Sequence, residues 1–578
     1  MSIKIYYDGK CPFCRSYTQY LRLKESQGEP QLIDVRIDEA SRLMLRSEGF
    51  DLDRGMVVDV KGRLYSGEKA VAVLAGLSSK SNLFNRINGW LFSSVYLAAI
   101  FYPVLRLGRN LVLLVLGVRP VNENPENQNL ILFSCCWGFF SVLHVLVYSY
   151  QYGVDLFWST YLVAAAGFLL FVRPDKVLLL LALLLLGVFD AWLQMPSFSN
   201  HTIIKNFFLL AIIFSGLTCA WRGDSWSDWF EVVAPVGRAL LLMMYVFGVF
   251  HKLNSGFLDP SVSCAVELWR SMPWPLYLVD WGWARYLFIY GTLIAEVAIL
   301  VFLLVPRFRH CGVLLGIAFH MMLALSNYAM YTAFSMLSVV LHILFISRAS
   351  AKAIIEDPLS RRFLSLSRSW RGWIIAAAYL SVIRVLAWMN VFWAVTLVWF
   401  FWVVPFLWIV FKYGKDKRDH RVSAVFFSKK PLLNVISLLF FVNCITPYLG
   451  LKTAQSINMF ANLRLEDGVS NHLVLSSPPG PFLYLENVVR IVSSTGVDYF
   501  NYVKANQLYI TYYDFLNRLE QHPAAIVSYE REGHIYLDKT AEDLSVEMEK
   551  VLHPEWVRKW FHFIPVDLNT PKACALDR

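Results

Sequence analysis

Residues 177–194 read VLLLLALLLLGVFDAWLQ, an apolar run that is long enough to cross a bilayer as one helix. Ten other runs have a comparable length and character, so the sequence predicts about eleven spans. The candidate spans are residues 130–149, 155–172, 177–194, 202–221, 231–252, 284–305, 311–328, 330–347, 372–389, 391–411 and 430–448. This pattern is typical of an α-helical polytopic membrane protein.

The composition of the whole chain points the same way. Of its 578 residues, 57% are hydrophobic and only 17% are charged, whereas an ordinary soluble domain is about a quarter charged. A disordered chain is excluded and a water-soluble enzyme is disfavoured. Much of the net charge of +10 comes from Lys and Arg in short loops between apolar runs, which argues against nucleic-acid binding.

The distribution of Lys and Arg predicts the orientation of the chain in the membrane. Basic residues gather in alternate loops, and the loops between them at 150–154, 195–201, 329 and 390 have none. By the positive-inside rule we expect the N-terminus inside and the C-terminus outside, with Arg270 as the exception. The polar first ten residues lack an apolar signal region, so we expect a cytoplasmic first domain.

Four segments are predicted along the chain. They are a thioredoxin-like α/β domain at residues 1–118, a polar linker at 119–129, a membrane domain at 130–448 and a small α+β outer domain at 449–578. The first domain should run strand, helix, strand, helix, hairpin, helix at residues 4–7, 12–24, 31–35, 38–46, 56–65 and 66–76. Residues 84–117 form apolar helices that either cap this domain or lie on the membrane. The outer domain should hold strands at 482–486, 525–529 and 535–537 and a helix at 540–552.

The sequence Asp8-Gly9-Lys10-Cys11-Pro12-Phe13-Cys14 lies where the first predicted strand ends and the first helix begins. Free N–H groups and the helix dipole at this position favour a thiolate on Cys11, and Cys14 follows one turn later. Pro12 fits the first turn because the N–H that it lacks has no partner there. We therefore expect Cys11 to be an exposed nucleophile and Cys14 the resolving thiol.

The alternative for this CxxC pair is half of a zinc site. Such a site needs a second CxxC pair or a pair of histidines, and residues 1–118 hold no other Cys and no His. Redox chemistry is therefore favoured, and no metal site is predicted.

The segment with Asp8, Cys11 and Cys14 resembles the DCC family of thiol-disulfide oxidoreductases, whose signature is DxxCxxC after the first strand. Residues 56–70, MVVDVKGRLYSGEKA, are similar to the hairpin and helix of that family, and the resemblance covers about residues 3–115. It implies exchange with a cytoplasmic thiol/disulfide protein or a small thiol, with Asp8 in the binding region. The chain departs from thioredoxin proper because it has no proline between Gln31 and Tyr102, where a cis-proline usually faces the cysteines.

Ionisable side chains inside the predicted spans form a second group of candidate residues, because such groups are costly in a bilayer and usually functional. They are Asp190, His201, Arg238, Lys252, Glu296 and His320. We expect a cavity open to the outer face to gather all of them except Arg238, which lies about 21 Å from Lys252 along a straight helix and should be structural. The alternatives are a snorkelling lysine, an interfacial His201, a hydrogen-bonded core His320, and a Glu296 that neutralises another buried charge.

The order of these residues resembles the vitamin K-dependent gamma-carboxylase family, which includes bacterial HTTM proteins, and this resemblance implies location in the inner membrane of a bacterium. The similarity spans about residues 130–450 and rests on Ser199-Asn200-His201, Arg238, the GVFHKLN sequence at 248–254, and Ala318-Phe319-His320. It implies Lys252 as a catalytic base and His201 as its partner. It also implies that Asn200, Asn254, Glu296, His320 and Arg238 bind the substrate, and that a reduced, vitamin K-like quinone serves as cofactor. A lysine in an apolar pocket can act as a base because its charged form is disfavoured there.

These features together predict a bifunctional membrane oxidoreductase with a CxxC exchange domain and a membrane site for a quinol or another lipid-soluble substrate. One alternative is a transporter or lipid-binding protein in which the ionisable residues hold the ligand. Another is a membrane anchor in which Lys252 and His201 tolerate substitution. Cys264 and Cys574, and Cys444 near the end of its span, are expected on the outer side. A disulfide is possible among these three, and an unpaired buried thiol is favoured for each.

Overall fold

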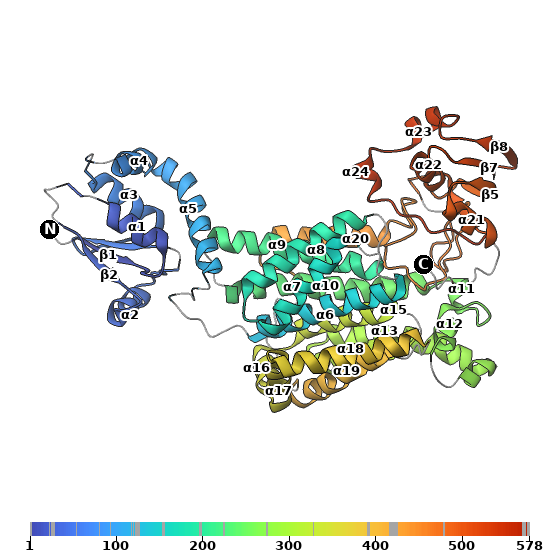
Figure 1. Ribbon diagram of the computed structural model, residues 1–578, viewed down its shortest axis with the longest axis horizontal. Coiled ribbons are helices and arrows are strands. Elements are labelled where there is room, and N and C mark those ends of the chain that lie inside the picture. Colours follow the sequence, from blue (N-terminus) through green and yellow to red (C-terminus); the bar gives the residue numbers. More distant parts are fainter. Residues whose placement is uncertain are drawn as a thin grey trace. The chain divides into compact units, whose positions relative to one another are not determined.

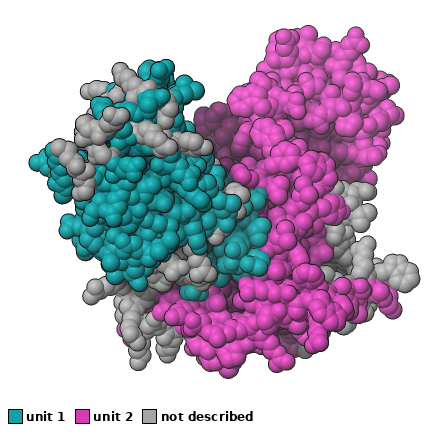
Figure 2. All heavy atoms as spheres, turned by 60° about the vertical axis from the view of Figure 1, so that its left-hand side comes forward, with its two compact units in different colours: residues 1–131, 173–182, 212–233 teal, residues 132–172, 183–211, 234–578 magenta. Residues whose placement is uncertain are grey.

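The computed structural model describes residues 3–568 and residue 574, except for residues 22, 25–28, 54, 80, 82, 93, 117, 119–120, 122–127, 153–156, 196–198, 223–225, 273–275, 327–328, 390–393, 415–425 and 478–479. The predicted linker lies mostly outside the described residues. The chain divides into two compact units, one of residues 1–131, 173–182 and 212–233 and one of residues 132–172, 183–211 and 234–578 (Figure 2). The first unit holds the CxxC pair and the second holds Lys252.

The first unit begins with a small α/β domain. Its elements are β1 (Ile3–Tyr7), α1 (Pro12–Tyr20), β2 (Gln31–Asp34), α2 (Glu39–Ser47), β3 (Val57–Val60), β4 (Arg63–Ser66) and α3 (Gly67–Leu77). The sheet order is β2-β1-β3-β4, with β1 parallel to β2 and the other pairs antiparallel. The predicted order of elements is confirmed.

Alternating side chains of β1 explain why this sheet is covered on both faces. Ile3 and Ile5 pack with Leu74 of α3 on one face, whereas Tyr6 packs with Leu45 of α2 on the other. Such burial removes apolar surface from water on both sides and fixes the strand register.

Two further helices, α4 (Leu83–Phe92) and α5 (Val95–Val115), cap this domain. Phe92 of α4 and Ala98 of α5 form a buried cluster with Val71 and Ala75 of α3. Of the two alternatives for residues 84–117, the structure therefore shows the cap. This arrangement matters for the CxxC pair, because α5 continues past it.

Among the residues that the structure describes, five helices are long and apolar enough to cross a membrane. They are α6 (Gln128–Tyr152), α8 (Val177–Gln194), α9 (Asn200–Arg222), α10 (Trp226–Lys252) and α13 (Gly282–Leu304). Shorter apolar helical segments lie at Trp158–Val172, which is α7, and at Tyr331–Phe345, Val403–Tyr413 and Pro431–Ile445. These helices are compatible with a membrane protein, while the eleven spans and their orientation stay predictions.

In the helical part of the second unit, α6, α7, α10 and α13 run in similar directions (Figure 1). The helices not yet named are α11 (Ser255–Leu258), α12 (Cys264–Arg270), α14 (Arg309–Leu323), α15 (Ala329–His342), α16 (Arg348–Glu356), α17 (Pro358–Ser367), α18 (Trp370–Trp388), α19 (Ala394–Tyr413) and α20 (Pro431–Ile445), with short 3₁₀ helices at Leu276–Asp280, Pro306–Phe308 and Ile343–Phe345. Glycine permits close contact between α6 and α7, since a Cβ atom on Gly138 would lie 2.7 Å from the carbonyl oxygen of Gly167.

The C-terminal part of the second unit is α+β, as predicted. Its elements are β5 (Val488–Thr495), α21 (Asp498–Ala505), β6 (Tyr509–Thr511), α22 (Tyr512–Glu520), β7 (Ile526–Arg531), β8 (His534–Lys539), α23 (Ser545–Val551) and α24 (Glu555–Arg558). The antiparallel sheet has the order β6-β5-β7-β8. The strand predicted at 482–486 is wrong, because that segment forms turns, and β5 and β6 were missed.

Candidate functional site

The CxxC pair lies at the N-terminus of α1. Cys11 is the N-cap residue, and its sulfur accepts a hydrogen bond from the backbone N–H of Cys14 at 3.0 Å. The backbone N–H of Cys11 donates to the carbonyl oxygen of Asp8 at 3.0 Å, and Pro12 takes the first helical position. Both cysteines are free thiols. The sulfur of Cys11 therefore lies where a helix N-terminus stabilises negative charge.

Two arginines from distant parts of the domain converge on Asp8. Arg36 donates to its carboxylate from Nε at 2.5 Å and from Nη2 at 3.0 Å, and Nη2 of Arg109 lies 3.5 Å from Oδ2. Arg109 also donates to the carbonyl oxygens of Asp53 at 2.6 Å and Leu52 at 3.4 Å. These contacts hold a buried cation next to the cysteines.

The two thiols differ in their pKa values. The hydrogen bond from the Cys14 side chain and, to a smaller extent, the positive charge of Arg109 lower the pKa of Cys11 to about 6, although burial opposes this shift. The same hydrogen bond and burial raise the pKa of Cys14. At neutral pH this gives a thiolate on Cys11 and a protonated thiol on Cys14, which is the division of charge that disulfide exchange requires.

The expected exposure of Cys11 is wrong, since this residue is 0% exposed and Cys14 is 6% exposed. The reason lies in α5, which brings Arg109 into contact with Cys11 and places Tyr102 near enough to act electrostatically on Cys14. Because Cys11 is fully buried, a disulfide substrate can reach its sulfur only when covering side chains move. The neighbouring Phe13 is 53% exposed.

An α/β domain whose first helix begins with a low-pKa CxxC thiol has the features of a thiol–disulfide oxidoreductase. Residues 5–113 match the family model of the DCC1-like thiol-disulfide oxidoreductases. This match includes Asp8, both cysteines and Arg109. No significant match to a curated protein or to a solved structure was found. The comparisons lend no support to the carboxylase resemblance of residues 130–450.

A cavity of about 340 Å³ lies in the second unit. Apolar side chains from α10, α12, α13, α14 and α15 form most of its wall, and Ile457, Met459 and Phe460 also line it. Its polar and ionisable lining residues include Asn200, Tyr245, Lys252, Trp269, Thr292, Glu296 and His320. An apolar chamber with few polar groups has the character of a site for a small molecule.

Lys252 forms an ion pair with Glu296 on the wall of this cavity. Its Nζ atom lies 2.5 Å from Oε1 of Glu296, and the two residues are each 8% exposed. The position of Lys252 on α10 and of Glu296 on α13 explains the pair, because neighbouring helices bring the two side chains together. The alternative in which Glu296 neutralises another buried charge is therefore the arrangement seen, whereas a snorkelling Lys252 is not.

The other expected members of this group lie elsewhere. The Nδ1 atom of His201 is 2.8 Å from the hydroxyl of Ser199, and its ring contacts the ring of His144 at 5.3 Å between centroids. Asp190 accepts hydrogen bonds from Ser159, Thr160 and Gln194. The cavity thus gathers Lys252, Glu296 and His320, while Asp190 and His201 are not among the described residues of its wall.

Three further predicted site residues contact the backbone. Asn200 lines the cavity and accepts from the N–H of Ile457 at 2.7 Å. The buried Asn254 caps α11 and donates to the carbonyl oxygens of two residues, His251 and Ala461. Arg238 donates to the carbonyl oxygen of Leu344 at 2.8 Å, in agreement with a structural role.

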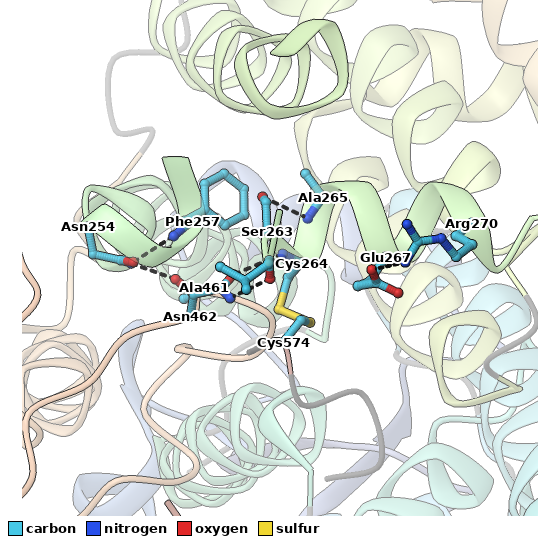
Figure 3. Close-up of a disulfide and its surroundings, with 11 residues drawn as sticks. Asn254, Phe257, Ser263, Cys264, Ala265, Glu267, Arg270, Ala461, Asn462 and Cys574 are labelled. Carbon is cyan, nitrogen blue, oxygen red and sulfur yellow. Dashed lines mark hydrogen bonds and ion pairs between the residues drawn. A yellow bond between two sulfur atoms is a disulfide. The ribbon is translucent and has the colours of Figure 1, made fainter. Parts of the chain in front are cut away.

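The chain carries a disulfide between Cys264 and Cys574 (Figure 3). The unpaired thiol that was favoured for these two residues is therefore wrong, whereas Cys444 is a free buried thiol. Cys264 begins α12, and its N–H donates to Oδ1 of Asn462 at 2.9 Å. The disulfide joins the end of the chain to a helix that lines the cavity.

Sequence reasoning missed three residues that belong to these sites. Arg109 lies among the apolar residues of α5. The signal available in the sequence was a basic residue within an otherwise apolar stretch. Tyr245 and His342 contact His320 through a chain of hydrogen bonds, with 2.9 Å from Tyr245 Oη to His320 Nε2 and 3.1 Å to His342 Nε2. Tyr245 lies two helical turns before Lys252, so the helical period placed both on one face.

Proposed function

We propose that the chain is a membrane-bound thiol–disulfide oxidoreductase in which Cys11 is the nucleophile and Cys14 the resolving thiol. The observation that carries this proposal is the sulfur of Cys11 at the N-cap of α1, where it accepts the Cys14 N–H at 3.0 Å. The two cysteines take different roles because Arg109 helps to lower the pKa of Cys11, whereas burial helps to raise the pKa of Cys14.

The exchange proceeds in two balanced steps. The Cys11 thiolate attacks one sulfur of a substrate disulfide, and the other sulfur leaves as a thiolate that takes a proton from solvent. The Cys14 thiol then loses its proton and attacks the Cys11 sulfur of the mixed disulfide, which releases the second substrate thiol. The substrate gains two electrons, and the domain ends with a Cys11–Cys14 disulfide that a cytoplasmic thiol must reduce.

The test uses glutathione disulfide and the full chain. Cys14→Ser should accumulate a mixed disulfide at Cys11, because the resolving thiol is gone, whereas Cys11→Ser should form none and lose reductase activity. Cys311→Ser is the matched control, since Cys311 is a free and exposed cysteine in α14. Reductase activity that survives in Cys11→Ser would contradict the proposal.

For the second unit we propose a site for a lipid-soluble substrate, with Lys252 as the base and a reduced quinone as the favoured class. The placement of Lys252 on the wall of an apolar cavity, with the carboxylate of Glu296 within reach to take its proton, supports this proposal. The full protein should be extracted gently and its bound lipids and quinones identified by mass spectrometry. We expect a bound quinone in the wild type, and a smaller amount of it or none in Lys252→Ala. The variant should also lose any quinol-dependent oxygen uptake. Unchanged oxygen uptake in Lys252→Ala would contradict the assignment.

A further inference from the structure

Three buried side chains of the second unit, His342, Tyr245 and His320, are joined by a chain of hydrogen bonds that ends at the cavity wall. His342 is 0% exposed, and Tyr245 and His320 are each 2% exposed. The hydroxyl of Tyr245 lies between Nε2 of His342 at 3.1 Å and Nε2 of His320 at 2.9 Å. Tyr245 and His320 line the cavity that also holds Lys252.

The direction of each hydrogen bond follows from the far end of this chain. Nδ1 of His342 lies 2.7 Å from the carbonyl oxygen of Ser338, and a carbonyl oxygen only accepts, so Nδ1 carries the proton. In the neutral ring Nε2 of His342 is then an acceptor, and Tyr245 donates to it. The oxygen of Tyr245 is left to accept from Nε2–H of His320.

This order of donors leaves Nδ1 of His320 unprotonated. That atom is buried and has no hydrogen-bond partner among the residues that the structure describes. Oε2 of Glu296, a second acceptor on the same wall, is likewise without a partner in the described part of the chain. Buried acceptors of this kind need a donor, so the wall is built for a ligand that supplies one.

A third atom completes the pattern. Nε1 of Trp269, a donor on the cavity wall, also lacks a partner within the described residues. A hydroxyl group donates one hydrogen bond, so one hydroxyl can satisfy one of the two acceptors, and its oxygen can accept from a donor. The rest of the wall is mainly apolar and fits the remainder of such a molecule.

We propose that Tyr245 and His342 are positioning residues that hold His320 with Nδ1 as a hydrogen-bond acceptor for a hydroxyl group on an apolar ligand. The inference rests on the proposed function of the Lys252 cavity as a ligand site. It adds the residues that set the polarity of the wall and the chemical group that they recognise.

Helix packing supports this role for His342. A Cβ atom on Gly316 of α14 would lie 2.0 Å from Nε2 of His342, so only glycine leaves room for the ring at its present position. Gly316→Ala therefore displaces His342 without changing any of the three hydrogen-bonding side chains. Gly282→Ala is the matched control, since a Cβ atom there meets nothing within 4 Å.

The first test reads the tautomer directly and needs no ligand. Full-length protein labelled with ¹⁵N-histidine should show His320, assigned by comparison with His320→Phe, as the tautomer with Nε2 protonated. Tyr245→Phe and Gly316→Ala should both disturb that signal, and Gly282→Ala should not. A wild-type His320 that carries its proton on Nδ1 would overturn the proposal.

The second test compares 1-naphthol with 1-methoxynaphthalene, which share an apolar body and differ in the O–H donor. We expect the wild type to bind 1-naphthol roughly tenfold more tightly, as for one hydrogen bond to a buried acceptor. Tyr245→Phe should bring this ratio close to one without weakening binding of the methoxy compound. If Tyr245→Phe does not fold, Gly316→Ala takes its place in this test. An unchanged ratio would overturn the positioning role. If neither compound binds to the wild type, the proposed ligand site fails, and the tautomer still tests the positioning of His320.

Discussion

Arg109 on α5 lies 3.5 Å from Asp8 at the end of β1, and this ion pair joins the last helix of the N-terminal domain to the loop that carries its cysteines. Asp8 is the first residue of the DxxCxxC signature. Asp8 assists the thiolate indirectly, because its carboxylate pairs with Arg109, and the positive charge of Arg109 helps to lower the pKa of Cys11. The DxxCxxC loop and α5 therefore act as one site.

Replacing Arg109 should make the domain a weaker oxidant. Arg109→Met removes a positive charge that stabilises the Cys11 thiolate, so the pKa of Cys11 should rise from about 6 and the reduced form should become less stable. The midpoint potential should become more negative by about 30 mV for each pKa unit. Equilibration with glutathione buffers measures this shift.

Arg106→Met is the matched control for that change. Arg106 lies one turn earlier on α5 and donates to the carbonyl oxygen of Trp221. Its replacement should leave the potential unchanged. Equal shifts in the two variants would mean that α5 is perturbed as a whole and that Arg109 has no specific role.

Gly9→Ala should damage the CxxC loop. A Cβ atom at Gly9 would lie 1.8 Å from Oδ2 of Asp34, whose other oxygen accepts the Gly9 N–H at 3.0 Å. We expect a lower melting temperature of the N-terminal domain and slower reduction of glutathione disulfide. Gly76→Ala is the comparison, because a Cβ atom there meets nothing within 4 Å. Equal effects would refute the steric explanation.

Glu296→Gln should destabilise the second unit. The change leaves the charge of Lys252 buried without its partner, which costs about 3 kcal/mol of unfolding free energy for a buried pair. The double variant Lys252→Met with Glu296→Leu should recover most of this loss, because neither charge remains. Thermal unfolding in detergent compares the variants, and a double variant no more stable than Glu296→Gln would contradict a paired role.

The Cys264–Cys574 disulfide tests both stability and orientation. Cys574→Ser should lower the unfolding free energy by about 3 kcal/mol.

Since disulfides persist in oxidising compartments, the predicted outside location of the C-terminus requires that Cys264 and Cys574 face outward. After reduction of intact cells, a membrane-impermeant maleimide should label Cys574, which is partly exposed, in the wild type. Labelling that needs lysed cells would contradict the predicted orientation.

Local sequence signals were sufficient for the elements of the N-terminal domain. Periodicity and turns placed β1, α1, β2, α2 and the hairpin within a few residues, because each is defined by its own side chains. The position of Cys11 at a helix N-terminus followed in the same way. Its burial did not, because the covering residue Arg109 comes from a distant helix.

Contacts between distant segments were also what sequence reasoning missed in the second unit. The presence of Lys252, Glu296 and His320 in one cavity was expected from charged residues in apolar helices. Which residue pairs with Lys252 depends on how α10 and α13 face each other, and no local pattern contains that. The Cys264–Cys574 bond joins residues 310 positions apart and was equally beyond local signals.

The central claim is that Cys11 is the thiolate nucleophile of an exchange domain. Alkylation of the reduced full chain with iodoacetamide, followed at each cysteine by mass spectrometry from pH 4 to 10, tests it most directly. Thiolate reacts and thiol does not, so the rate at Cys11 should rise through a midpoint near pH 6 and then level off, with Cys14 unreactive. A midpoint near the ordinary value of 9.0, or faster reaction of Cys14, would contradict the account.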